Sequence, residues 1–280
     1  MLAPDQLERV EIVLVSPRNP LNIGAAARAM ANFGFHHLSI VAPFATNWME
    51  AKSAVGAPDL LRDARVHETL AEAVADCTLV LGTGSLDRRR PEQAILDLPK
   101  AGEQVRSALA TTQILGAPGL DPETWDHNSN RQPRIALVFG SEKHGLTSDD
   151  LSWCHALIVI ETCEAQPSMN LGQAVAVCLY EISRTPATAE LPLLEPTRLP
   201  DSAQLDRLAE LIEQTMEAVN YTTRGMRSAN GAALRILLRR LMPKEADLRR
   251  IMGLFRRILW QLAHNSRHQK TKPSYSGKQS

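Results

Sequence analysis

The sequence has no net charge, few cysteines and no long apolar run. Its four cysteines form no C-x-x-C pair, so we expect mostly buried free thiols rather than a zinc site or a disulfide scaffold. No apolar stretch approaches the roughly 20 residues that span a bilayer, and the segment from Met1 to Arg9 lacks the apolar core of a secretory signal. We therefore expect a cytoplasmic protein without a membrane partner.

Several common catalytic motifs are also missing. The sequence contains no Walker loop and no G-x-S-x-G elbow, and its histidines show no metal-ligand spacing, so no metal is expected. The run Gly82-Thr83-Gly84-Ser85 follows an apolar segment, but the third glycine of a dinucleotide fingerprint would fall on Asp87. The two glycines therefore indicate a close backbone approach, either to a ligand or within a tight turn.

The charges that are present divide unevenly along the chain. Residues 1–200 carry 16 Lys and Arg against 24 Asp and Glu, a net charge of −8. Residues 201–280 carry 15 against 7, a net charge of +8. The neutral total thus conceals an acidic front and a basic back, and such an asymmetry indicates a polyanionic partner.

The first 185 residues alternate short apolar runs with helical stretches, which predicts an α/β fold with a parallel sheet covered by helices on both faces. The expected strands are 10–15, 38–41, 77–81, 134–139 and 156–160, and the expected helices are 22–33, 68–75 and 171–183. Ligands bind outside the carboxyl ends of the strands in such sheets. The candidate site therefore consists of the loops 16–22, 82–85, 140–145 and 161–170.

The pattern changes after residue 185. Prolines at 186, 192, 196 and 200 predict a linker over 186–200. Apolar residues then recur with helical spacing, which predicts helices at 204–220, 232–241 and 245–262 in a small all-α domain spanning 201–264. The polar and basic residues 265–280 are expected to be disordered, and 117–133 to form a long surface loop.

Three strand-end segments combine small and polar residues in a way that simple packing does not explain. The first places Asn22 and Arg28 among alanines at the start of a helix, and the second brackets Glu142 between two glycines. The third, Pro167-Ser168-Met169-Asn170-Leu171, contains residues suited to cap the next helix. Capping alone accounts for the third segment, but not for the three together.

In order and spacing these segments, N-x-G-x-x-x-R, F-G-x-E-x-x-G-L and P-S-x-N-L, resemble the three signature motifs of the SpoU/TrmH family of SPOUT RNA methyltransferases. We name them motif one (22–28), motif two (139–146) and motif three (167–171). The resemblance covers about residues 8–185, so 1–185 is the expected methyltransferase domain. It implies a parallel sheet whose C-terminal part threads into a trefoil knot, and a homodimer in which helix 171–182 is a candidate interface.

The resemblance also implies a cofactor, S-adenosyl-methionine, held within the knot largely by backbone groups. The matching positions in this sequence are Thr83, Gly84, Ser85, Gly140, Ile160, Pro167, Ser168, Met169 and Leu171. The glycines would let the main chain approach an adenosine, and the apolar side chains of this set would face the adenine.

The implied reaction transfers the sulfonium methyl group to a ribose 2′-hydroxyl, which depends mainly on alignment. In the family the arginine of motif one, here Arg28, binds the phosphate beside the target ribose and helps to deprotonate the hydroxyl. A guanidinium is a poor base, so phosphate anchoring is the safer expectation. Asn22, Glu142, Ser168 and Asn170 match the other polar positions, and Glu142 is expected to orient Arg28 through a charge-assisted hydrogen bond.

The basic helical part resembles the extension of family members that methylate position thirty-two in the anticodon loop of tRNA. Its cations, expected to follow RNA phosphates, are Arg224, Arg227, Arg235, Arg239, Arg240, Lys244, Arg249, Arg250, Arg256 and Arg257. We therefore expect a tRNA 2′-O-methyltransferase whose partner is tRNA and not DNA. Methylation of ribosomal RNA and a non-catalytic RNA-binding role are the alternatives.

Overall fold

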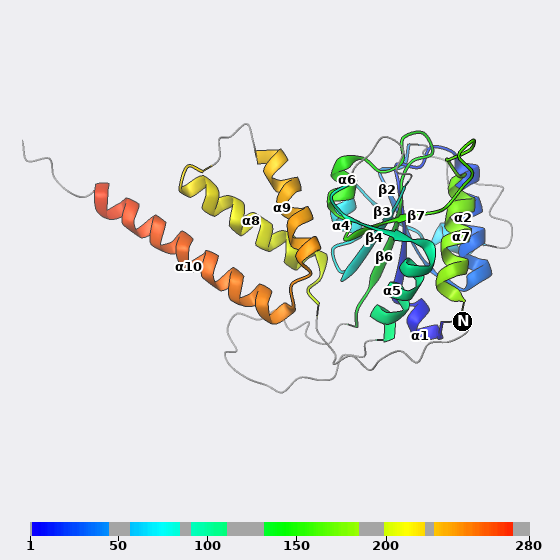
Figure 1. Cartoon of the computed structure of the whole chain (residues 1–280), viewed down its shortest axis with the longest axis horizontal. Helices are drawn as coiled ribbons and strands as arrows, with labels where there is room; N and C mark the ends of the chain where they lie inside the picture. The colour runs from blue at the N-terminus through cyan, green and yellow to red at the C-terminus, as the bar shows by residue number, and fades with distance from the viewer. Residues whose placement is uncertain are drawn as a thin grey trace, which may run out of the picture.

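The computed structural model describes residues 2–44, 57–84, 91–110, 132–184, 199–221 and 227–270 (Figure 1). Several predicted features lie outside this part, namely Ser85, Arg224, most of the loop 117–133, most of the linker 186–200 and residues 271–280. The side chain of Arg227 is also outside it.

Within the described residues, seven strands form one parallel sheet in the order β3-β2-β1-β6-β4-β7-β5. The strands are β1 (Val10–Val15), β2 (His37–Val41), β3 (Arg65–His67), β4 (Leu79–Thr83), β5 (Ala94–Asp97), β6 (Ile135–Phe139) and β7 (Ala156–Val159). Every residue of β1, β4 and β6 is buried, which explains their nearly continuous apolar sequences. The predicted parallel α/β fold is confirmed.

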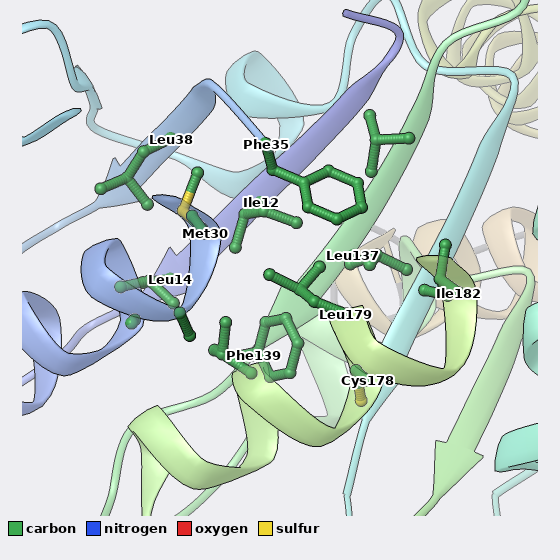
Figure 2. Packing of buried hydrophobic residues seen from close by; sticks show 14 of the residues in the cluster. Ile12, Leu14, Met30, Phe35, Leu38, Leu137, Phe139, Cys178, Leu179 and Ile182 are labelled. Carbon is green, nitrogen blue, oxygen red and sulfur yellow. The ribbon is translucent and has the colours of Figure 1, made fainter. Parts of the chain in front are cut away.

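Helices cover both faces of this sheet. The helices of the described chain are α1 (Pro4–Leu7), α2 (Pro20–Phe33), α3 (Pro58–Arg62), α4 (Leu70–Ala73), α5 (Leu98–Ala110), α6 (Ser148–Ser152), α7 (Leu171–Ser183), α8 (Ser202–Ala218), α9 (Arg227–Leu241) and α10 (Glu245–Lys270). Alternate strand residues divide between the faces. Ile12 and Leu14 pack with Met30 of α2 and Leu179 of α7 (Figure 2), whereas Val13 belongs to the core on the other face, beneath α4 and α6.

Short polar signals set the ends of the helices that border the candidate site. Asn19 begins α2 by accepting a hydrogen bond from the backbone N–H of Leu21 (3.0 Å), and Pro20 occupies the first helical position. Gly34 ends α2 with φ 77°, a left-handed conformation that glycine adopts without steric cost. Asn170 begins α7 in the same way as Asn19 begins α2, so each helix starts at a fixed place at the sheet edge.

Helices α8, α9 and α10 pack around a small core of their own, which we call the core of the helical extension. Its buried members are Leu205, Leu208, Ala209, Leu238, Leu248 and Met252. Figure 1 shows α9 facing α6, and α10 extending away from the sheet. Helix α10 runs to Lys270, so residues 265–270, which were predicted to be disordered, are helical instead. None of the described helices is both long and apolar enough to cross a membrane.

Some elements differ from the sequence prediction for identifiable reasons. Strand β4 runs two residues further than predicted, because Gly82 still pairs with β6 and Thr83 with β7. The predicted helix 68–75 is shortened to the four residues of α4. The edge strands β3 and β5, which were not predicted, are only partly buried and therefore lack a continuous apolar run.

The contact between α2 and α7 leaves no room for a side chain at Gly172. A Cβ there would lie 2.6 Å from the Cβ of Ala25, so Gly172→Ala should force the helices apart and lower the free energy of unfolding by about 1–3 kcal/mol. Gly253→Ala in α10 is the matched control, because nothing lies within 4 Å of its Cβ and alanine favours a helix by up to about 1 kcal/mol. Urea unfolding measures both effects, and a harmless Gly172→Ala would contradict the close approach.

Candidate functional site

The loops that contain the three motifs meet at one edge of the sheet. Strands β1, β6, β4 and β7 are consecutive in the sheet, and parallel strands all end at the same edge. Motif one follows β1, motif two begins at the end of β6, Gly84 follows β4, and motif three follows β7. Segments that are more than a hundred residues apart in sequence are therefore neighbours in space.

Motif two folds into a tight loop that requires its two glycines. The Gly145 N–H donates to the Ser141 carbonyl (2.8 Å), and the two residues form an antiparallel bridge. A Cβ at Gly140 would lie 2.1 Å from the carbonyl carbon of Gly145, and Gly145 itself has φ 64°. Any side chain at Gly140 would open this loop, which carries Glu142.

The carboxylate of Glu142 is the central group of the site. Its Oε2 accepts a hydrogen bond from the backbone N–H of Arg18 (2.9 Å), while its Oε1 accepts from the N–H of Asn19 (3.0 Å) and from Nδ2 of Asn22 (2.9 Å). Partial burial by itself raises the pKa of Glu142, but the hydrogen bonds from Asn22 and the backbone outweigh it and hold the pKa below its usual value. Glu142 is therefore a fixed anion that ties motif two to motif one.

Asn22 continues the network to motif three. Its Oδ1 accepts a hydrogen bond from Nδ2 of Asn170 (2.8 Å), and Oδ1 of Asn170 accepts from the backbone N–H of Gly172 (2.9 Å). Each amide thus has a donor role on one side and an acceptor role on the other, which fixes its orientation. The close approach of α2 and α7 makes this direct bridge possible.

Arg28 and Ser168, the other two predicted catalytic residues, stand outside this network. Arg28 lies six residues beyond Asn22, about 9 Å further along α2, and its exposed side chain has no hydrogen-bond or ion-pair partner in the described part of the chain. The predicted hydrogen bond from Arg28 to Glu142 is therefore not formed, because Arg28 lies further along α2, and Asn22 and backbone donors bind the carboxylate instead. Ser168 is exposed in the loop before α7.

The predicted cofactor residues that the structure describes surround the ends of three neighbouring strands. They are Thr83 and Gly84 at β4, Gly140 at β6, and Ile160, Pro167, Ser168, Met169 and Leu171 between β7 and α7. Ile160 and Met169 are half-buried, so part of each apolar surface faces outward beside exposed main chain. Partly exposed apolar side chains next to main chain at the ends of strands fit a nucleoside-bearing cofactor that is held by backbone groups. Among the described residues no group of His, Cys, Asp or Glu could hold a metal ion.

The glycines at the end of β4 serve two different purposes. A Cβ at Gly82 would lie 2.8 Å from Sγ of Cys154 and 3.0 Å from a methyl group of Leu146, so Gly82 is required by internal packing. A Cβ at Gly84 would touch only Leu157, at 3.5 Å and beyond. The main chain at Gly84 is thus the part of this turn that a ligand can approach.

Two residues at the rim of the site were not predicted individually: Arg18, although it lies in the predicted site loop 16–22, and Phe44, which lies in none of the predicted loops. The Phe44 N–H donates to the Pro17 carbonyl (3.2 Å), and the Arg18 guanidinium lies 4.4 Å from the centroid of the Phe44 ring, a residue that is 69% exposed. An exposed aromatic ring beside an arginine is typical of surfaces that stack nucleic-acid bases. Neither residue belongs to a motif. Only their positions in the loops that follow β1 and β2 could have indicated that they lie at the site.

The cations of the helical extension fall into two groups. Arg235 and Arg239 turn toward the α/β body, and Arg239 is only 1% exposed, so the prediction that these two follow phosphates is wrong. The cations that are exposed and described are Arg240, Lys244, Arg249, Arg250, Arg256 and Arg257. A helical pattern of basic residues did not reveal which of them faces another part of the same chain.

Residues 9–180 match the SpoU rRNA Methylase family. The tRNA (cytidine/uridine-2′-O-)-methyltransferase TrmJ of Citrobacter koseri is 31% identical over 258 residues, which is 90% of this chain and 97% of the relative. TrmJ of Escherichia coli O6:K15:H31 is 31% identical over 257 residues, or 90% of this chain and 96% of the relative.

Solved structures show the same similarity. The crystal structure of TrmJ from Z. mobilis ZM4 superimposes with a TM-score of 0.71 at 25% identity and covers 89% of this chain and 98% of that protein. A probable methyltransferase from Bordetella pertussis Tohama I gives a TM-score of 0.53 at 28% identity, over 65% of this chain and 98% of its own. Because the first match covers 89% of the chain, the similarity continues beyond the sheet into the helical extension.

The lowered pKa of Glu142 predicts how its contribution to stability depends on pH. Because the folded-state pKa lies below the ordinary value of 4.5, the ionised carboxylate stabilises the fold above that pH. The contribution is lost as pH falls through the folded-state pKa. Glu142→Gln cannot ionise, so its deficit in unfolding free energy relative to the wild type should be present at about pH 6 and shrink toward about pH 3.

Urea unfolding at a series of pH values measures this deficit. Asn22→Ala is the control, because it leaves the two backbone donors to Glu142 in place. The pH-dependent part of its deficit should be smaller, added to a constant part from the lost hydrogen bond to Asn170. A Glu142→Gln deficit that is constant across this pH range would contradict the role of the carboxylate as a fixed anion.

Proposed function

The chain belongs to the SpoU methylase family, and on that premise we propose that it transfers a methyl group from S-adenosyl-methionine to a ribose 2′-hydroxyl of tRNA. The observation that carries the proposal is the hydrogen-bonded chain Glu142–Asn22–Asn170, which joins three motifs at the same sheet edge as the partly exposed Gly84. Relatives that cover 90% of the chain are tRNA methyltransferases by name, which favours tRNA over ribosomal RNA as the substrate.

The cofactor supplies an electrophilic methyl group when bound, so the task of this chain is to hold and align the ribose. We assign Arg28 to the phosphate beside the target ribose, because its guanidinium is exposed and its planar fork matches phosphate oxygens. Ser168 is assigned to the ribose, since its side chain is exposed at the same edge. Asn22, Glu142 and Asn170 bond to one another, and we assign them to positioning rather than to substrate contact.

We further propose position thirty-two of the anticodon loop as the target, and the helical extension as the main RNA-binding surface. Residues 201–280 carry a net charge of +8, whereas residues 1–200 carry −8, so phosphate attraction arises mainly in the extension. Because the proposed substrate is tRNA, we also propose that the enzyme is cytoplasmic.

A homodimer with a trefoil knot in each subunit completes the proposal. Strand β7 lies inside the sheet between β4 and β5, and α7 then packs beside α2 from the start of the chain, as a threaded C-terminal part would require. Leu21 of α2 and Tyr180 of α7 are large apolar residues that are exposed. A second subunit on these helices would cover them and would bring Arg28 toward the cofactor site of its partner.

Arg28→Ala should lower methyl transfer to tRNA by at least about 100-fold, because the phosphate anchor that aligns the ribose is lost. Binding of S-adenosyl-methionine, measured by calorimetry, should not change. Mass spectrometry of digested tRNA after reaction with the purified protein measures the transfer and locates the methylated ribose. Arg62→Ala, which removes an exposed arginine of α3, is the matched control and should keep full activity.

Two outcomes would contradict parts of the proposal separately. Full activity of Arg28→Ala would remove the role assigned to Arg28. Methylation of ribosomal RNA, with none on tRNA, would replace the substrate while leaving the reaction in place.

The exposed cations of the extension predict a salt-dependent contribution to RNA binding. Arg240→Gln and Arg256→Gln should each weaken tRNA binding and lower the slope of log affinity against log salt concentration by about 0.7–0.9, because each removes one phosphate contact. Filter binding at several salt concentrations measures the slope, with Arg62→Gln as the control. An unchanged slope in both variants would show that these arginines do not contact phosphates.

A further inference from the structure

Two arginines and one tryptophan join the helical extension to the α/β body. Trp153 immediately follows α6, and Arg235 and Arg239 lie one turn apart on α9, the helix that faces α6 (Figure 1). The guanidinium carbons of Arg235 and Arg239 lie 4.6 Å and 5.2 Å from the centroid of the Trp153 ring, which is within the range of cation–π attraction. We name these three residues the clasp.

Directional hydrogen bonds hold the clasp in one orientation. Arg235 donates from Nε to Oγ of Ser152 (2.9 Å) and from Nη2 to Oδ1 of Asp149 (2.7 Å), so it contacts α6 at two points. Arg239 donates from Nε to the Trp153 carbonyl (2.9 Å). Three directed bonds and two ring contacts fix the angle between α9 and α6, which apolar packing alone would leave less defined.

The start of the extension is attached at a second place. The backbone N–H of Ser202, the first residue of α8, donates to the Cys77 carbonyl (2.9 Å), and the N–H of Ala203 donates to the Ala75 carbonyl (3.0 Å). Two separate attachments prevent the extension from rotating about either one. One attachment lies on the α/β body just before β4, and the other lies on α6 and on the residue that follows it.

Burying the guanidinium of Arg239 costs free energy that an apolar contact at the same place would not. Arg239 is 1% exposed, and its Nη2 has no hydrogen-bond partner among the described residues. Burial lowers the pKa of Arg239 to about 10, so the side chain is still charged at neutral pH. Replacing a buried ion pair as a whole by apolar side chains of similar volume is often neutral or stabilising. The unpaired Nη2 is a cost that stability alone does not explain, whereas the directed bond from Arg239 to the Trp153 carbonyl fixes an orientation.

The clasp acts on the helix that follows motif two. Thr147, next to the last motif-two residue, and Asp150 cap α6 reciprocally, so the helix begins at a fixed place. Leu146 before α6 and Cys154 after it both pack against Gly82 at the end of β4. One short helix is thus held by the loop of Glu142 at its start and by the extension at its end.

We propose that Trp153, Arg235 and Arg239 are positioning residues. They hold the exposed cations of α9 and α10 at a fixed place and angle relative to the sheet edge where the three motifs meet, which we call the reaction edge. The inference rests on the proposed function, because this placement matters only if one RNA contacts both parts. A rigid joint lets phosphate contacts on the extension raise the effective concentration of the target ribose at the edge. Loosening the joint should therefore weaken tRNA binding and leave cofactor binding unchanged.

Arg239→Met tests the clasp, because methionine is unbranched and flexible enough to fill the site while it removes the charge and the hydrogen bond. We expect the KM and the Kd for tRNA to rise at least about tenfold. The kcat at saturating tRNA and the Kd for S-adenosyl-methionine should stay close to the wild-type values, while the unfolding temperature should fall, because the Trp153 carbonyl loses its donor and the half-buried Asp206 loses a neighbouring cation. Arg62→Met, with the same change in charge on α3, is the matched control and should keep the wild-type KM.

Exchanging the charges of Arg235 and Asp149 distinguishes a loss of orientation from a general loss of structure. Arg235→Glu places a carboxylate opposite Asp149 and should raise the KM for tRNA in the same way. Adding Asp149→Arg restores opposite charges at this pair, and the double variant should recover most of the lost affinity. X-ray scattering of the free protein should show a larger radius of gyration for Arg239→Met and for Arg235→Glu than for the double variant.

The possible failures can be told apart. A wild-type KM and Kd for tRNA in Arg239→Met would overturn the positioning role. So would a parallel fall in kcat and cofactor affinity, because that pattern marks a merely structural contact. A wild-type protein that binds tRNA without methylating it would overturn the proposed function instead, and the binding and scattering measurements would still decide whether the clasp positions the extension.

Discussion

The arrangement of the candidate site depends on one carboxylate, that of Glu142, and on the loop that carries it. The loop is possible because residues 140 and 145 lack side chains, and it delivers an anion to backbone donors of the loop after β1 and to Asn22 of motif one. Asn22 accepts from Asn170 with the oxygen of the same amide that donates to Glu142. A displacement of motif one therefore breaks hydrogen bonds to both of the other motifs, so three distant segments behave as a single site.

This network also separates positioning from substrate contact. The polar atoms that hold the motifs together already have partners, whereas Arg28 and Ser168 are exposed and form no hydrogen bond or ion pair within the described chain. Arg18 and Phe44 extend this exposed rim on the side of β2. The proposed RNA substrate would thus meet an edge whose shape is fixed by internal hydrogen bonds and whose exposed groups are cations, a hydroxyl and an aromatic ring.

Sequence reasoning was most successful where burial is complete. Strands β1 and β6 and helix α7 were predicted closely, because burial on both faces of a sheet, or along a broad helix face, leaves an unmistakable apolar pattern. It failed at the partly buried edge strands β3 and β5. It also assigned Glu142 to Arg28 and Arg239 to phosphate, because spacing predicts which segments meet but not which donor reaches an acceptor first, nor which polar face turns inward.

The helical extension and the reaction edge are connected through α6, and this connection bears on the kind of RNA that fits. A helix of five residues has little stability of its own, so its position is set by what holds its two ends. One end follows the loop of Glu142, and the other is fixed by Trp153 and the arginines of α9. The distance from the exposed cations to the edge is then a property of the fold rather than of a flexible tether. A fixed distance suits a folded RNA, whose phosphates also keep fixed positions and whose shape is what proteins recognise, better than it suits an unstructured strand.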